Sequence, residues 1–387
     1  MVRRMLLGAV LVCCPITVAF ATPKYWYGDV SGSWTALDNV KGTNWSLRVD
    51  GNQNTNNLPG ANDAVVFSSA TNTNYRTVTV AGSPTIDSLS FNSNATNSYT
   101  IKSSTLTLNA SGGTGILVDA ASGDHTISSN ITLAVDQSFD IQTPGVADAN
   151  ALLISGKISG GGRHLTKTGG GTLQLTGGLN DYSGGTTISA GLLRINNPVN
   201  SSATGSGTVL VDPQGTLGGN GYLTGSIDLK GTIAPGNSIG TLHTGDQNWY
   251  SGGHYQLEIN APAGAPGTNW DLLDITGTLD LTSAAGFDIQ LFSIDNTNQP
   301  APLSGFDNTT SQSWIIAQTQ GITSFSGGLL SVDTTGFAND LAGGAFGVGV
   351  DGTNLLLQFT PASELPEPAG VVLIIGAILP LRRRRRN

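Results

Sequence analysis

Two groups of acidic residues in this sequence have the residue types that polysaccharide-cleaving enzymes use. Such enzymes need two carboxylates about 5–10 Å apart, or a carboxylate beside a base. Asp119, Asp124 and His125 surround a Ser-Gly turn, and Asp271 and Asp274 lie three positions apart. Side chains three apart on a strand point to opposite faces, so Asp271 and Asp274 cannot form one site. Asp beside a turn commonly bonds the local backbone, so we expect a structural role for the first group too, with catalysis or metal binding as the alternative.

Metal, phosphate and cofactor chemistry has little support in the remaining residues. His164, His243 and His254 are scattered and lack the close spacing of a zinc-binding pair. The glycine runs at 160–162 and 169–171 precede no expected helix, and no Gly-Lys-Ser/Thr sequence follows them, so they are not phosphate-binding loops. We therefore expect no cofactor and no metal site.

The elements that would position any site are strands and turns. The chain has 53 glycines in 387 residues and only 11% charged residues, whereas glycine is usually about 7% and charged residues about 25%. Gly, Thr, Ser and Asn favour turns and strands over helices. An all-α protein and a coiled coil are therefore excluded.

The charge of the body of the chain excludes nucleic-acid binding. Seven of the 17 basic residues stand in the two end segments, which leaves 10 against 24 acidic residues between Thr22 and Ser363. Binding to nucleic acid depends on neutralising phosphates with Lys and Arg. Glu258 is the only glutamate among those acids, and the excess of aspartate again favours loops and turns.

The N-terminal segment predicts export. Arg3 and Arg4 precede an apolar run at 5–20, and Ala19-Phe20-Ala21 has the small–x–small pattern of a signal-peptidase site. Cleavage there would make Thr22 the first residue of the mature chain, after passage through the Sec machinery. Cys13 and Cys14 are the only cysteines, so the exported chain would have neither disulfides nor thiol chemistry.

The C-terminal segment has the order of a sorting signal. Pro366-Glu367-Pro368 is followed by an apolar stretch at 369–381 and then by five arginines, namely Arg382, Arg383, Arg384, Arg385 and Arg386. This arrangement resembles the PEP-CTERM sorting signal of bacterial exported proteins. The resemblance implies cleavage near Pro366 by an exosortase-type membrane protease. A helix of 13 residues is about 20 Å long, shorter than the ~30 Å hydrocarbon core, so we expect a transient membrane anchor.

The middle of the chain predicts a β-solenoid. Between 156 and 197, short alternating strands are separated by glycine pairs. Leu173 and Leu175 would share one face of their strand, as would Leu193 and Ile195 of theirs. The unit Gly-Thr-Leu or a close variant recurs from Gly171 to Gly240 at uneven intervals. The interval from Gly171 to Gly191 suits one coil of a solenoid, in which each coil buries its apolar stripe against the next.

This stretch also resembles the autotransporter-associated β-strand repeat. The resemblance rests on Leu165-Thr166-Lys167-Thr168-Gly169 leading to Gly171-Thr172-Leu173, and on Tyr182-Ser183-Gly184-Gly185-Thr186 leading to Gly191-Leu192-Leu193. It implies an exported, right-handed parallel β-helix. The expected fold is thus all-β, a right-handed parallel β-helix with an N-terminal cap and a C-terminal β-rich region.

The expected organisation has five parts. These are a signal peptide at 1–21, a β-rich cap at 22–100, a solenoid at 101–245 with the repeat at 156–197, a β-rich region at 246–360, and the sorting signal at 361–387. Tyr25, Trp26, Tyr27, Trp34 and Trp45 are expected to pack inside the cap, with an exposed sugar-stacking platform as the alternative.

Three functions remain open. The first is a non-enzymatic protein of the bacterial surface or extracellular matrix, engaged in adhesion, exopolysaccharide contact or biofilm. The second is a carbohydrate-active β-helix enzyme, and the third is a structural envelope protein with no ligand. The expected partners are the Sec machinery, an exosortase-type protease and polysaccharide or other surface polymers, without nucleic acid.

Overall fold

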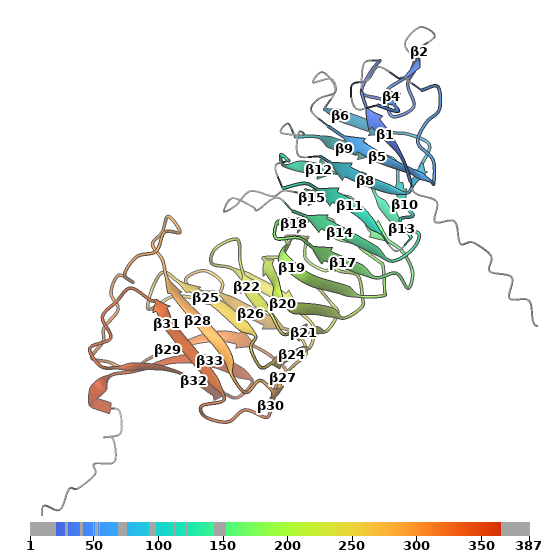
Figure 1. The fold of residues 1–387 in the computed structure, drawn as a ribbon. Coiled ribbons are helices and arrows are strands. Elements are labelled where there is room, and N and C mark those ends of the chain that lie inside the picture. The colour runs from blue at the N-terminus through green and yellow to red at the C-terminus, as the bar shows by residue number, and fades with distance from the viewer. Residues whose placement is uncertain are drawn as a thin grey trace, which may run out of the picture.

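The protein is an elongated stack of β-strand coils with its two ends far apart (Figure 1). The structure, a computed structural model, describes residues 21–364 except 28–29, 39–41, 49, 51–52, 54, 69–75, 93–97, 112, 121 and 143–151. This part contains no α-helix and one short 3₁₀ helix, η1 (Ala362–Glu364). Nearly all strand pairs are parallel. The expectation of an all-β parallel β-helix is confirmed.

The strands of successive coils form three faces. The first face stacks β1 (Thr22–Trp26), β5 (Asp63–Phe67), β8 (Ser88–Phe91), β11 (Thr114–Val118), β14 (Gln137–Ile141), β17 (Leu165–Thr168), the first halves of β19 (Thr186–Ile195) and β20 (Val209–Gly219), β21 (Ile227–Leu229), β24 (Gln247–Tyr250), β27 (Thr278–Ser283) and β30 (Gly321–Thr323).

The second face runs beside the first for the whole stack. It consists of β6 (Thr77–Val80), β9 (Thr100–Ser103), β12 (His125–Ile127), β15 (Leu152–Ile154), β18 (Thr172–Leu175), the second halves of β19 and β20, β22 (Thr232–Pro235), β25 (His254–Ile259), β28 (Phe287–Ser293) and β31 (Leu330–Gly336). Because β19 and β20 continue around the corner, the first two faces form one hydrogen-bonded sheet.

The third face is shorter and interrupted. Its N-terminal part is β7 (Thr85–Ile86), β10 (Leu106–Leu108), β13 (Ile131–Leu133) and β16 (Ile158–Ser159), and its C-terminal part is β23 (Thr241–Thr244), β26 (Leu272–Ile275) and β29 (Gln312–Gln318). Single bridges such as Tyr222 with His243 carry the face between these parts. The coils thus extend into both flanking ranges, 22–100 and 246–360.

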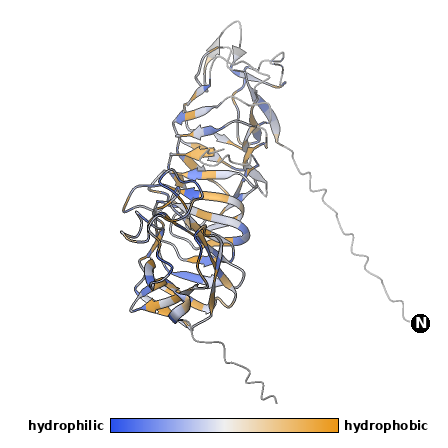
Figure 2. Ribbon diagram, turned by 90° about the vertical axis from the view of Figure 1, so that its left-hand side faces the viewer, coloured by the Kyte–Doolittle hydropathy of each residue, from blue (hydrophilic) through white to orange (hydrophobic). Residues whose placement is uncertain are grey.

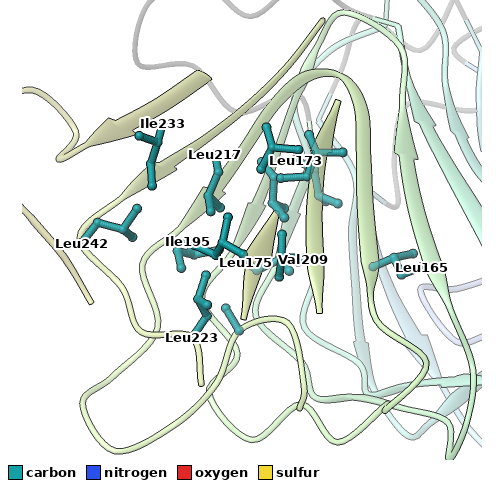
Figure 3. Packing of buried hydrophobic residues seen from close by; sticks show 14 of the residues in the cluster. Leu165, Leu173, Leu175, Ile195, Val209, Leu217, Leu223, Ile233 and Leu242 are labelled. Carbon is teal, nitrogen blue, oxygen red and sulfur yellow. The ribbon is translucent and has the colours of Figure 1, made fainter. Parts of the chain in front are cut away.

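Alternation along the strands fills the interior with apolar side chains. Leu173 and Leu175 are fully buried beside Leu193 and Ile195 of the next coil, as their alternation predicts. Figure 3 shows these stripes from neighbouring coils meeting in the interior, and Figure 2 shows apolar and polar residues alternating along the ribbon. Stacking of coils buries a continuous core that no single coil could bury alone.

Columns of glycine form two of the corners. Gly191 pairs with Gly215 on the next coil. Gly231 stands at the same corner one coil further on, directly before β22. A Cβ on Gly215 would lie 2.1 Å from the carbonyl oxygen of Ile188, and one on Gly231 would lie 2.1 Å from that of Asp212. A second column at the corner before the first face contains Gly207, Gly225 and Gly245. The uneven Gly-Thr-Leu intervals arise because the glycines belong to different corners, with Gly240 before β23 of the third face, and because the coils differ in length.

Lys167 occupies an interior position in an otherwise apolar stack. It lies between Phe139 and Ile188 on the first face and is fully buried. Its Nζ donates to the carbonyl oxygens of Thr168 (2.8 Å), Gly169 (2.8 Å) and Ala190 (3.0 Å). The ammonium therefore joins the corners of two successive coils. Burial lowers the pKa of Lys167 to about 8, although the nearby Asp140 carboxylate raises it.

Aromatic clusters close both ends of the core. Trp26, Trp34 and Trp45 are fully buried, and Trp45 packs edge-on against both of the others. These tryptophans are core residues, so the alternative of an exposed tryptophan platform is wrong. At the C-terminal end, β33 (Asn354–Thr360) pairs antiparallel with β29 and with β32 (Ala345–Asp351), over a cluster around Phe346 and Phe359. Near the N-terminus, β4 (Trp45–Ser46) pairs antiparallel with β1, and β2 (Leu37–Asp38) with β3 (Gly42–Thr43).

The glycine corners predict a strong contrast between two Gly→Ala changes. Gly191 has φ +68°, and its Cβ would lie 2.5 Å from the Gly169 carbonyl oxygen, whereas a Cβ on Gly170 meets nothing within 4 Å. Gly191→Ala should lower the free energy of unfolding by about 2 kcal/mol or more, and Gly170→Ala should change it by less than ~0.5 kcal/mol. Urea unfolding of both variants tests this, and equal losses would contradict it.

Lys167 predicts a pH dependence of stability. Since the folded state holds the pKa near 8 against 10.5 in the unfolded chain, the unfolded state binds the extra proton between these values, and stability rises with pH across that window. Below pH 8 the charged amine costs about 3 kcal/mol, at roughly 1.4 kcal/mol per pKa unit. From pH 7.5 to 10.5, the unfolding free energy of wild type should therefore rise by about 3 kcal/mol relative to that of Lys167→Met.

Urea titrations at pH 7.5, 9 and 10.5 measure this difference. Lys157→Met is the matched control, because Lys157 is a surface lysine of the preceding coil, paired with Asp181 at 2.6 Å. A flat difference for Lys167→Met would show that burial does not hold its pKa down.

Candidate functional site

His125 is built into the core and does not face a substrate. It lies in β12 with 1% of its surface exposed, stacked on Phe91 with ring centroids 4.0 Å apart. The backbone N–H of Tyr99 donates to Nδ1 at 3.1 Å, so Nε2 carries the proton and donates to Ser122 Oγ at 2.7 Å. Burial lowers the pKa of His125 to about 3. Both ring nitrogens are occupied, and the imidazole stays neutral.

The two flanking aspartates do not turn this region into an acid–base site. Asp119 begins the turn, and its carbonyl accepts the N–H of Ser122 at 2.9 Å. Partial burial raises the pKa of Asp124. His125 is engaged on both nitrogens, one of them by Ser122, and the Asp119 carbonyl also holds Ser122, so two of these three residues help to fix the turn.

Asp271 and Asp274 point to different surroundings, as their spacing predicts. Asp271 is 1% exposed, and its oxygens accept the backbone N–H groups of Gly240 (2.9 Å) and Glu258 (2.8 Å). Burial raises the pKa of Asp271 well above its usual value, against the two N–H donors, which lower it. Asp274 instead lies at the surface and contacts His243 Nδ1 at 2.7 Å.

Two of the other histidines are also held by hydrogen bonds in the solenoid, whereas His254 Nδ1 only approaches Asp288 Oδ2 at 3.9 Å. His243 stacks flat on Tyr222, with centroids 4.0 Å apart and planes at 3°. His164 bonds the Gly184 carbonyl at 2.8 Å and Thr187 Oγ1 at 3.0 Å. No group of three His, Cys, Asp or Glu side chains suited to a metal ion occurs in the described part of the chain.

A hollow in the described surface lies on the outer side of the second face. It encloses about 400 Å³, and we call it the groove. Its lining comes from β19, β20, β22, β25 and β28 and from the loop after β22, and comprises Leu192, Arg194, Thr216, Gly218, Gly219, Ala234, Pro235, Gly236, Asn237, Ser238, Gln256, Glu258, Asp271 and Phe292. Apart from Asp271, sequence reasoning assigned no site role to these residues.

The groove owes its polar wall to residues from distant parts of the sequence. Glu258 is half-buried and accepts Ser238 Oγ at 2.7 Å. Its backbone N–H is the one held by Asp271, so the buried carboxyl positions the half-exposed one. The pairing register of the coils places Arg194 and Gln256 on opposite sides of the hollow. The sequence alone does not give this register, because the coils differ in length.

Most of the predicted processing residues lie outside the described part of the chain. At the N-terminal cleavage site, the structure describes Ala21 and Thr22 but not Ala19. The C-terminal signal, namely Pro366, Glu367, Pro368 and the arginine run at 382–386, stays a prediction from sequence. Thr22 begins β1, and its N–H donates to the Asn62 carbonyl at 3.0 Å. Within the described residues, no helix has the length and apolar character to cross a membrane.

Comparisons with known proteins point to the middle of the solenoid. The passenger-associated-transport-repeat family matches residues 165–195, which hold β17, β18 and β19. This stretch is therefore an autotransporter-type repeat, and the resemblance drawn from the sequence is confirmed there.

Two relatives share longer segments. An extracellular serine protease of Serratia marcescens is 41% identical over 107 residues, which are 27% of this chain and 10% of the protease. The adhesin BmaC autotransporter of Brucella suis biovar 1 (strain 1330) is 38% identical over 136 residues, 30% of this chain and 4% of the adhesin. The match thus spans a tenth or less of either relative.

The two backbone bonds of Asp271 predict a selective loss of stability. In Asp271→Asn one acceptor oxygen becomes a donor, so a buried backbone N–H of Gly240 or Glu258 is left unpaired at a cost of about 1–3 kcal/mol. Asp274→Asn, in β26 and at the surface, should cost less than ~1 kcal/mol. Thermal unfolding of both variants measures this, and an unchanged Tm for Asp271→Asn would contradict the assigned role.

Proposed function

We propose that this chain is an exported bacterial protein of the cell surface or extracellular matrix, which contacts polysaccharide or other surface polymers without cleaving them. The observation that carries the proposal is the autotransporter-type repeat at 165–195, set within a continuous solenoid. One matched relative is named as an adhesin and the other as extracellular, which supports display outside the cell and adhesion or biofilm association.

The outer faces suit weak, repeated polar contacts. Hydroxyl and amide side chains of successive coils lie side by side, as in Thr132 with Ser159 (3.1 Å), Thr208 with Ser226 (3.0 Å) and Asn248 with Asp228 (2.8 Å). Many weak contacts along a rigid rod add up to a strong attachment when the partner is itself a repeating polymer.

Export and sorting are assigned to the two end segments. Cleavage before Thr22 would leave β1 complete, and its first N–H would keep the bond to Asn62. An exosortase-type protease would then process the chain near Pro366, with the segment at 369–381 in transient contact with the membrane. The sorting signal supports this step through the order of its parts.

A carbohydrate-active enzyme is the second candidate. It is favoured by one observation, the presence of Glu258 and Asp271 in the lining of the same groove. Against it, both oxygens of Asp271 accept backbone N–H groups, and a carboxyl so engaged positions its neighbours. A purely structural envelope protein, with no ligand, is the third.

Processing at both ends is tested in the native host. Mass spectrometry of the protein recovered from the surface or medium should give Thr22 as the first residue and a C-terminus before Arg382. Glu367→Ala should leave most of the protein uncleaved and in the membrane fraction, because the protease would lose the central residue of its motif, whereas Pro361→Ala should be processed normally. Surface protein that retains the arginine run would overturn the sorting assignment.

A further inference from the structure

We propose that the groove is a binding site for a neutral oligosaccharide, whose sugar chain lies across the coils along the solenoid axis. This inference deepens the proposed function and rests on it, because it names the place and the polymer class of one surface contact. Nothing in the sequence marks the site, since its residues are spread from Leu192 to Phe292.

The groove is a gap in a row of long polar side chains. Cross-coil pairing places six residues in one outward row on the second face: Gln174, Arg194, Gly218, Ala234, Gln256 and Gln290. The two small residues in the middle form the floor, and the long side chains on either side form the walls. Strands in a sheet lie about 4.8 Å apart, so Arg194 and Gln256 stand about 14 Å apart at the backbone.

The lining offers suitable partners to the apolar faces and to the hydroxyl groups of a sugar ring. Leu192, Pro235 and Phe292 are apolar, and the C–H faces of a pyranose pack on such surfaces. Gln256 and Asn237 carry amides that donate and accept hydrogen bonds, which hydroxyl groups require. A ligand that is apolar on its faces and hydroxylated around its rim fits this mixture.

Charge in and around the groove favours a neutral ligand. The guanidinium of Arg194 forms no ion pair within the described residues, and the one half-exposed carboxylate in the lining is Glu258. These two charges offset one another. The body of the chain has 24 acidic against 10 basic residues, so a polyanion such as a polyuronate would be repelled on approach.

The row continues past the groove, which favours a chain over a single sugar. Gln256 Nε2 donates to Gln290 Oε1 at 3.4 Å on the next coil. On the other side, Gln174 stands one coil beyond Arg194. A longer oligosaccharide can therefore use further amides in line with the groove, at no cost in rearranging the rigid backbone.

Calorimetric titration of the exported protein tests the site. The probes are hexasaccharides of β-1,4-glucan, β-1,3-glucan, β-1,4-xylan and β-1,4-mannan, with glucose and hexagalacturonate as comparators. Wild type should bind at least one neutral hexasaccharide more tightly than glucose or hexagalacturonate. Arg194→Gln, which shortens a wall and removes its charge, should raise Kd about 10-fold, the loss expected for hydrogen bonds to a charged group.

Two further variants separate filling of the groove from loss of a contact. Ala234→Gln places a long side chain on the floor and should raise Kd by about 30-fold or more, and Gln256→Ala should weaken binding without adding bulk. Arg163→Gln is the matched control for Arg194→Gln, because Arg163 lies in an exposed turn away from the groove; its Kd should match that of wild type. The Tm of each variant establishes that it is folded.

Failure of the inference differs from failure of the proposed function. Absence of binding to all four neutral hexasaccharides, or binding of hexagalacturonate alone, would overturn the ligand class. Binding that Ala234→Gln and Gln256→Ala leave unchanged would overturn the groove, while polymer contact elsewhere on the solenoid would stand. Release of shorter sugars, followed by chromatography, would overturn the non-enzymatic function and leave the groove as the site.

Discussion

The close approach of backbone to backbone at the corners is the constraint on which the rest of this molecule depends. At Gly215 and Gly231 a Cβ would lie 2.1 Å from a carbonyl oxygen of the preceding coil, so a side chain there would push adjacent coils apart. Parallel strands pair only at about 4.8 Å, and any wider spacing would break hydrogen bonds on both adjoining faces. Two columns of glycine therefore keep the coils in register, and the register in turn decides which side chains share a row.

The same close corners create a polar problem in the interior, which Lys167 solves. Carbonyl groups of Thr168, Gly169 and Ala190 meet at this corner, and the buried Nζ donates to all three. A buried charge is costly, and the lowered pKa of Lys167 reflects that cost. Three unpaired buried carbonyls would also be costly. The lysine thus adds the cost of a buried charge and removes the cost of unpaired carbonyls at a point where two coils are joined.

Local patterns in the sequence predict the strands and the solenoid, because each depends on neighbours in the chain. Leu173 and Leu175 alternate with polar residues in a way that only a half-buried strand explains, and both are buried. The pairing of distant residues is different in kind. The stacking of His243 on Tyr222 and its bond to Asp274 join three coils of unequal length. Intervals between glycines could not supply the register, because they mix different corners and coils of unequal length.

The groove follows from register and illustrates how a solenoid can acquire a site without altering its fold. Every coil presents one residue to the outward row that contains Arg194 and Gln256, and the backbone under the row is fixed by the corners. Replacing long side chains by Gly218 and Ala234 in two successive coils is enough to open a hollow between rigid walls. Because the floor is hydrogen-bonded sheet, such a hollow is already formed before a ligand arrives, and little conformational entropy is lost on binding. A rod that holds one modest site and long polar rows on either side of it is better suited to grip a repeating polymer at many points than to hold one small molecule tightly.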